Sequence, residues 1–149
     1  MIFLVVSASG RCGRGCTTST TTPATVYFPS GTYLISSSIF DFYYTNLIGN
    51  PNSRPIIKAT ANFAGFGLID GNPYFTQDQN WLSTTVFWRQ VRNFVFDLTA
   101  IPPASPATGI HWPTAQATSI QFVEFRMSTA SGVQAVGLFI ENGMLFILT

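Results

Sequence analysis

The chain has 149 residues, of which 46% are hydrophobic and only 9% are charged, and its formal net charge is +1. An ordinary globular domain has roughly 25% charged residues, so this sequence is poor in the charged residues that long solvated helices expose. It contains no cluster of basic residues that would indicate binding to nucleic acid or to an anionic membrane. The length allows one domain, and the apolar fraction is enough to fill its core. No run approaches the roughly 20 apolar residues that span a bilayer, so we expect no membrane segment.

The amino terminus contains a short apolar run, MIFLVVSASG, over residues 1–10. This run lacks a basic start and is too brief to be a persuasive signal peptide. We therefore interpret residues 1–10 as a non-native or disordered tail, and we place the domain at residues 11–143.

Cys12 and Cys16 are the two cysteines of the chain, and their spacing in RCGRGC is wider than that of a CxxC redox motif. A structural zinc site needs four Cys or His ligands, and the chain adds a single histidine, His111, far along the sequence. A disulfide between Cys12 and Cys16 is therefore more economical than free thiols. The sequence also lacks a phosphate loop, a nucleophile elbow and a dinucleotide fingerprint, so we expect neither a metal nor a cofactor.

Short apolar segments separated by turns follow a threonine-rich stretch. Residues 26–28 and 33–35 contain the β-branched and aromatic side chains that suit a pleated surface. Residues 29–31, Pro-Ser-Gly, form a turn between them, because Pro fixes φ and Gly tolerates a positive φ. Residues 46–51 and 55–59 form a second unit of the same kind. We expect strands of three to six residues broken by tight turns.

Residues 66–71 are expected to begin another coil. The segment NPYFTQDQNWLS at residues 72–83 then interrupts the alternation of short strands and tight turns. A long aromatic insertion can be a binding loop, in which Tyr74 and Trp81 would offer platforms to the apolar face of a sugar ring. In the alternative interpretation, both rings pack on the flank of the domain.

A repeat of nearly thirty residues is the most informative pattern in the chain. Three pairs of apolar residues recur at an offset of 29, and Gly109-Ile110 recurs as Gly137-Leu138 at an offset of 28. The three pairs are Val91 with Ile120, Phe94 with Val123, and Phe96 with Phe125. A recurrence of 20–50 residues in strand-forming sequence is typical of a solenoid, in which each coil covers the apolar face of its neighbour. The repeat predicts an all-β fold, a parallel β-helix with irregular loops.

Several motifs in order resemble one enzyme family. RCGRGC, PATVYFPSGTYLIS, LIGNPNSRPIIKATANF, GLIDG, VFWRQVRNFVFD and ATGIHWPTAQATSIQFVEF are similar to the amino-terminal β-helix of fungal exo-β-1,3-glucanases, glycoside hydrolase family 55, within the pectate-lyase-like superfamily. The resemblance covers residues 11–143. It implies part of a right-handed parallel β-helix, an incomplete one, from an extracellular enzyme that hydrolyses β-1,3-glucan with inversion.

The resemblance also implies partners and an expected continuation. The proteins of that family have two β-helices side by side with a sugar-binding cleft between them. The resemblance therefore implies that a second β-helix and a polysaccharide are the partners of this chain. The last six residues, MLFILT at 144–149, depart from the Ser/Gly-rich stretch that the family has there. We interpret residues 144–149 as a non-native tail, an intron read as coding sequence, and we expect the chain to be inactive alone.

The acidic residues do not show an obvious catalytic pair. An inverting glycosidase needs a general acid and a general base some 6.5–9.5 Å apart. Asp70 and Asp97 follow strands at turns, where carboxylates accept backbone N–H groups, and Glu124 alternates outward between apolar neighbours. A structural role is therefore preferred for each of the six acids, and the resemblance implies that the general-acid glutamate lies outside this chain. The six are Asp41, Asp70, Asp78, Asp97, Glu124 and Glu141.

The segment HWPTAQATS carries the leading polar candidates. Gln116 could position the attacking water or the terminal sugar, because an amide both donates and accepts hydrogen bonds; the alternative is an internal amide ladder between coils. His111, Trp112 and Thr118 lie in the same segment and are candidates for substrate binding. The alternative for His111 and Trp112 is a packed edge with satisfied ring nitrogens.

Two other functions compete with glucan hydrolysis. A pectin lyase or polygalacturonase needs clustered acids, often with calcium or a basic residue, and the sparse charges disfavour it. A non-catalytic carbohydrate-binding or surface-attachment β-helix would use Tyr74, Trp81 and Trp112 without hydrolysis.

Overall fold

The computed structural model describes residues 22–74, 81, 86–113, 117–141 and 146–148. Within these ranges all nine regular elements are β-strands, and each strand pairing is parallel. The strands are β1 (Ala24–Phe28), β2 (Thr32–Phe40), β3 (Thr45–Gly49), β4 (Ile56–Asp70), β5 (Gln90–Asp97), β6 (Thr108–Pro113), β7 (Thr118–Arg126), β8 (Val136–Glu141) and β9 (Phe146–Leu148). In the part of the chain that is described, no helix has the length and apolar character needed to cross a membrane.

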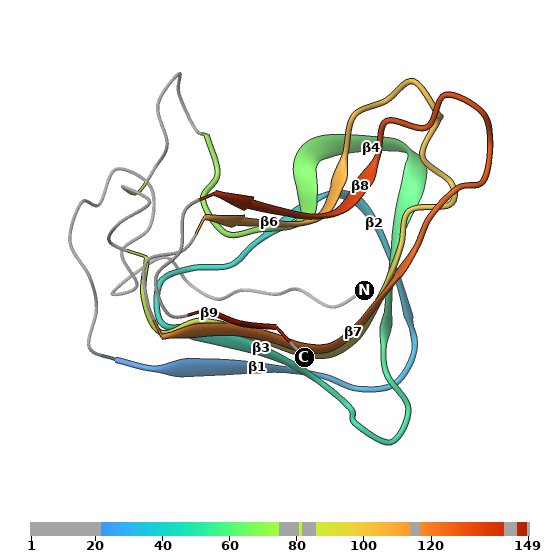
Figure 1. Ribbon diagram of the computed structural model, residues 1–149. Coiled ribbons are helices and arrows are strands. Elements are labelled where there is room, and N and C mark those ends of the chain that lie inside the picture. The colour runs from blue at the N-terminus through green and yellow to red at the C-terminus, as the bar shows by residue number, and fades with distance from the viewer. Residues whose placement is uncertain (1–21, 75–80, 82–85, 114–116, 142–145, 149) are drawn as a thin grey trace.

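The strands form two stacks that alternate along the chain. β1, β3, β5, β7 and β9 pair in that order, and β2, β4, β6 and β8 pair in a second series. The beginning of β4 also pairs with the end of β5, which joins the two series into one sheet. Figure 1 shows the two stacks facing each other, with β6 and β8 across from β3, β7 and β9. The all-β, parallel arrangement expected from the sequence is confirmed.

The repeat in the sequence corresponds to the register between coils. Val91 pairs with Ile120, Phe94 with Val123 and Phe96 with Phe125 in β5 and β7, and Ile110 pairs with Leu138 in β6 and β8. Both predicted offsets are therefore confirmed. Since parallel strands in register place equivalent side chains on the same face, the inward residues of successive coils form continuous apolar rows. The row of Leu47, Val91 and Ile120 is buried throughout.

The prediction of uniformly short strands is wrong for part of the chain. β4 has 15 residues and β2 and β7 have nine each, and residues 66–71 do not begin a new coil but include the end of β4. Register shifts between β2 and β4 explain how the long strand turns a corner, because Ile35 pairs with Ala59 whereas Ile39 pairs with Ile69. β4 thus contains extra residues and arches outward (Figure 1), as a strand with a bulge bends.

A buried arginine ties three coils together at the ends of β2, β4 and β6. Arg89 Nη1 donates hydrogen bonds to the carbonyl oxygens of Asp41, at 2.8 Å, and Gly71, and Nη2 donates to that of Pro113 at 3.0 Å. Its Cζ lies 4.7 Å from the ring centroid of Trp112, a cation–π contact. The guanidinium therefore supplies hydrogen-bond donors to three buried carbonyl groups at these strand ends.

The carboxylate of Asp41 is buried beside this arginine. Asp41 Oδ2 lies 4.0 Å from Arg89 Nε, and neither carboxylate oxygen has a hydrogen-bond partner among the described residues. Burial raises the pKa of Asp41 from 3.8 to about 7, although the charge of Arg89 opposes the shift. Burial also lowers the pKa of Arg89 to about 10, against the opposing charge of Asp41.

We predict that Asp41 makes the folded state less stable as pH rises. Because its folded pKa is raised above the unfolded value of 3.8, its contribution is fully present below about pH 4 and is lost as pH rises through about 7. The loss is on the order of 4 kcal/mol. Urea unfolding across this range should show the decline, and Asp41→Asn should flatten it. An unchanged pH profile in Asp41→Asn would contradict the assignment.

The packed rows predict a large penalty for removing one member. Ile120→Ala should lower the free energy of unfolding by about 3 kcal/mol, because the neighbouring coils cannot fully close the cavity. Gln121→Ala, at the next position of the same strand, should change it by less than about 0.5 kcal/mol. Chemical denaturation of the two variants and the parent measures the difference, and equal stabilities would refute the inward assignment of Ile120.

Candidate functional site

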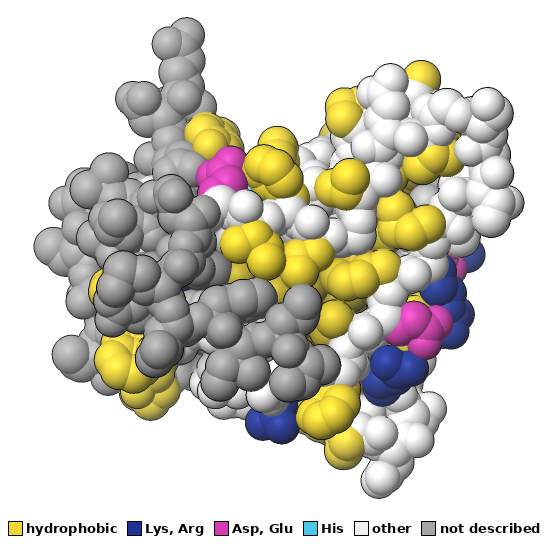
Figure 2. Space-filling view, in the orientation of Figure 1, with side chains coloured by type: hydrophobic (Ala, Val, Ile, Leu, Met, Phe, Trp, Pro, Cys, Tyr) yellow, Lys and Arg dark blue, Asp and Glu magenta, His cyan; other side chains and the backbone are white. Residues whose placement is uncertain are grey.

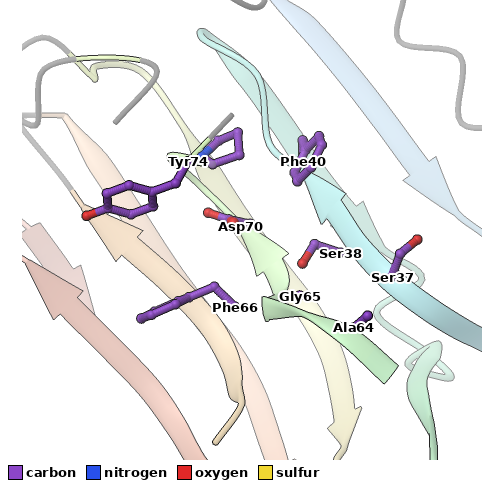
Figure 3. Close-up of a pocket in the computed structure, with 9 residues that line it drawn as sticks. Ser37, Ser38, Phe40, Ala64, Gly65, Phe66, Asp70 and Tyr74 are labelled. Atoms are coloured by element: carbon purple, nitrogen blue, oxygen red, sulfur yellow. The ribbon is translucent and has the colours of Figure 1, made fainter. Parts of the chain in front are cut away.

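An open hollow of about 430 Å³ lies where β2 and β4 end. Figure 3 shows the carboxylate of Asp70 between Phe40 on one side and Tyr74 and Phe66 on the other. The exposed fractions of Tyr74 and Phe66 are 46% and 44%, so these rings form accessible walls. The lining residues are Ser37, Ser38, Phe40, Ala64, Gly65, Phe66, Asp70, Pro73 and Tyr74.

Strand alternation brings these side chains to the outer face of the sheet. Ile69 and Ile110 are completely buried and belong to the core cluster, so the next residue of each strand points outward. Asp70 pairs with His111 across β4 and β6. The outer row continues at both ends, where Phe40 of β2 pairs with Asp70 and Phe139 of β8 pairs with His111.

Aromatic rings cover His111 although it lies on the outer face. The side chain has no exposed surface. Its ring centroid lies 4.3 Å from that of Phe66, 5.9 Å from that of Phe139 and 6.3 Å from that of Tyr74. Tyr74 is nearly parallel to the imidazole, at an interplanar angle of 17°. The imidazole therefore has a fixed orientation beneath the hollow.

A chain of polar contacts runs from Asp70 through His111 towards Glu141. His111 Nδ1 lies 2.8 Å from Asp70 Oδ1, and the same oxygen accepts the backbone N–H of Asn72 at 3.0 Å. Because a carboxylate accepts, Nδ1–H is the donor. Within the described part of the chain His111 Nε2 has no hydrogen bond, and it lies 3.7 Å from Glu141 Oε2. The imidazole thus directs a ring nitrogen towards a second, partly exposed carboxylate.

The sequence matches the family model described as rhamnogalacturonase A/epimerase, pectate lyase-like, over residues 2–147. The chain belongs to this pectate lyase-like family. A parallel sheet whose coils stack in register agrees with that membership, and the predicted superfamily is confirmed.

Fungal proteins are similar to this pectate lyase-like chain over nearly its whole length. A glucan 1,3-beta-glucosidase of Cochliobolus carbonum is 48% identical over 141 residues, which are 93% of this chain and 18% of the relative. A probable glucan endo-1,3-beta-glucosidase of Arthroderma benhamiae is 43% identical over 145 residues, which are 95% of this chain and 16% of the relative. The resemblance to fungal β-1,3-glucanases is confirmed.

A third relative carries a different name. A non-secreted LysM effector of Penicillium expansum is 42% identical over 143 residues, which are 95% of this chain and 11% of that protein. The pectate lyase-like chain therefore spans less than a fifth of the length of each of these three relatives.

Only some of the residues predicted from sequence meet at the hollow. Tyr74 and His111 come together there. Trp112 and Thr118 are buried, Trp112 beneath Arg89, so their side chains do not offer a surface to a sugar. Gln116, Cys12 and Cys16 lie outside the described residues.

Trp81 requires a correction. Its side chain is 1% exposed and packs with Tyr43 and Val86 in a second apolar cluster. Asn72 Oδ1 accepts the backbone N–H of Trp81 at 2.9 Å, and Asn72 Nδ2 donates to the backbone carbonyl oxygen of Trp81 at 2.8 Å. The ring is therefore a packing group, as the alternative interpretation had it, and not an exposed sugar platform.

Asp70, Phe66 and Phe40 were not predicted as site residues. The turn role expected of Asp70 is confirmed by its bond from Asn72, but its partnership with His111 was missed because the two residues are 41 positions apart. That separation does not match the 28- or 29-residue period, since residues 72–83 intervene. Among the described residues, no group of three or more His, Cys, Asp or Glu side chains is arranged to hold a metal ion.

The single histidine of the chain makes the Asp70 contact directly testable. Nitrogen NMR of the imidazole should show a proton on Nδ1, held by the carboxylate. Asp70→Ala should remove that hydrogen-bonded signal and lower the free energy of unfolding by about 2 kcal/mol, because a charged acceptor is lost. Asp97→Ala, remote from the histidine, should leave the imidazole signals unchanged. Persistence of the Nδ1–H signal in Asp70→Ala would rule out the contact.

Proposed function

We propose that this chain is a glucan-binding portion of a carbohydrate-active enzyme that hydrolyses β-1,3-glucan, built on part of a right-handed parallel β-helix. The names of two similar fungal proteins support the reaction, because both are glucan 1,3-beta-glucosidases or endo-glucosidases by name. The hollow at Asp70, with exposed aromatic walls and a carboxylate between them, is the observation that carries the binding role.

The chemistry of the hollow suits a sugar ring. A pyranose has an apolar face of C–H groups, which can lie on an aromatic ring such as Tyr74 or Phe66. Its hydroxyl groups can donate to the carboxylate of Asp70. The hydroxyl of Ser38 lies in the hollow, buried and without a hydrogen-bond partner among the described residues, and an unsatisfied polar group favours a polar ligand beside it.

Binding and hydrolysis are assigned to different parts of the enzyme. Inversion needs a general acid and a general base on opposite sides of the scissile bond. Asp70 already holds His111 and Asn72, which is a positioning role. We assign the general acid to a second β-helix outside this chain, and the positioning of water to Gln116. The chain alone should then bind glucan without releasing glucose.

Two features weigh against an acidic polymer as the ligand of this hollow. None of the described residues that line it is a lysine or an arginine, and recognition of uronic acid carboxylates relies on such cations. The hollow instead contains a carboxylate, which would repel a polyuronate. A neutral glucan is therefore preferred over a pectin, although the family description includes a rhamnogalacturonase.

A non-catalytic role in carbohydrate binding or surface attachment is the second candidate. The aromatic walls of the hollow would serve it equally, and an extracellular location remains a prediction because one relative is named non-secreted. Release of glucose by an assembly of this chain with its second β-helix would favour the enzyme over the non-catalytic binding module.

Tyr74→Ala should weaken binding to laminarin by about tenfold, since loss of one stacking ring is worth roughly 1.4 kcal/mol. Retardation in gels containing laminarin measures the effect. Tyr27→Ala is the matched control, because Tyr27 is also an exposed tyrosine, at 55% against 46% for Tyr74, and it lies on β1, outside the lining of the hollow. Parallel gels with polygalacturonate should show no retardation. Equal retardation of both variants, or preference for polygalacturonate, would overturn the proposal.

A further inference from the structure

Phe122 has a backbone conformation that disfavours its side chain. Its φ is 54°, in the left-handed region. Asn93 occupies the equivalent corner in the preceding coil, because Arg92 pairs with Gln121 and Phe94 pairs with Val123, and its φ is 63°. The corner therefore demands a positive φ in successive coils. Asn accepts this conformation readily, whereas a bulky aromatic residue is a genuine outlier there.

Packing does not compensate for this strain. The side chain of Phe122 is 57% exposed, so most of its ring faces solvent. A residue that is both strained and exposed lowers stability without filling the core. Such outliers gather at binding sites, where the strain is retained for function.

The surroundings of Phe122 form a second hollow. It encloses about 530 Å³ and is lined by Pro51, Arg54, Asn93, Phe122 and Val123. None of these residues lines the hollow at Asp70. The two hollows are therefore separate sites.

Polar side chains in this second hollow are held in place. Arg54 Nη1 donates to the Phe122 carbonyl oxygen at 3.4 Å, and Nη2 donates to Glu124 Oε2 at 2.9 Å. Asn93 Nδ2 donates to the Gly49 carbonyl oxygen at 3.1 Å. An aromatic ring beside a fixed guanidinium and a fixed amide matches the two aspects of a pyranose, an apolar face and a hydroxyl edge.

We propose that Phe122 is the stacking platform of a second saccharide-binding site, which takes a neutral β-glucan chain. The choice of a glucan rests on the proposed function. The guanidinium of Arg54 already pairs with Glu124, whose other carboxylate oxygen pairs with Arg126, so Arg54 does not require an acidic sugar as its partner. A protein partner fits less well, because the described lining of this hollow offers one exposed ring beside the charged Arg54, whereas specific interfaces centre on a larger desolvated core.

A fluorine label on the Phe122 ring tests the site without relying on the first hollow. The label is placed in a Tyr74→Ala variant of the whole chain, and a soluble β-1,3-gluco-oligosaccharide is titrated while fluorine NMR is recorded. A saturable shift of the resonance is expected. An unchanged resonance overturns the second site, even when the parent chain is retarded by laminarin and the proposed function stands.

Phe122→Asn provides the second arm, because Asn93 shows that the corner accepts this residue. Relief of strain should raise the midpoint of thermal unfolding, whereas retardation by laminarin should weaken severalfold. Phe122→Tyr should restore retardation, since it keeps the ring. A lower unfolding midpoint in Phe122→Asn would refute the strain argument. A change in sedimentation coefficient with unaltered retardation would assign the ring to a protein contact and overturn the saccharide site.

Discussion

Parallel pairing in register between coils is the constraint on which the rest of this structure depends. Once β5 and β7 pair at an offset of 29 residues, every side chain of one coil lies above its counterpart in the next. An apolar residue must then face another apolar residue, and a polar residue must find a partner along the same row. The core rows and the outer row of Phe40, Asp70, His111 and Phe139 are two results of this one rule.

The same rule decides how much could be predicted from sequence. Val91 and Ile120 revealed the period because no insertion separates their coils, and the parallel sheet followed from that period. Asp70 and His111 also lie side by side, but residues 72–83 lengthen the intervening coil, so their spacing carries no visible period. The burial of Trp81 could not be predicted either, because a segment without a sequence period does not indicate whether a tryptophan ring is exposed or packed against Tyr43.

Scarcity of charge makes the placement of each charged group informative. Three of the four described cations other than Arg89 pair directly with acids. Arg54 and Arg126 both pair with Glu124, and Lys58 pairs with Asp97. Among the described cations Arg89 alone is fully buried, and backbone carbonyl groups and the indole of Trp112 contact its guanidinium in place of water. The hollow at Asp70 differs because its carboxylate contacts an imidazole and faces aromatic rings, and this local polarity distinguishes it from the remaining surface.

The position of Arg89 has a consequence for local fluctuations. One guanidinium bonds carbonyl groups from three successive coils, so opening any of these coils disturbs the anchorage of the other two. A solenoid otherwise communicates only between nearest neighbours, and its ends can fray one repeat at a time. At this corner the coils are coupled beyond nearest neighbours, and we expect their amide hydrogens to exchange with solvent as a single cooperative unit.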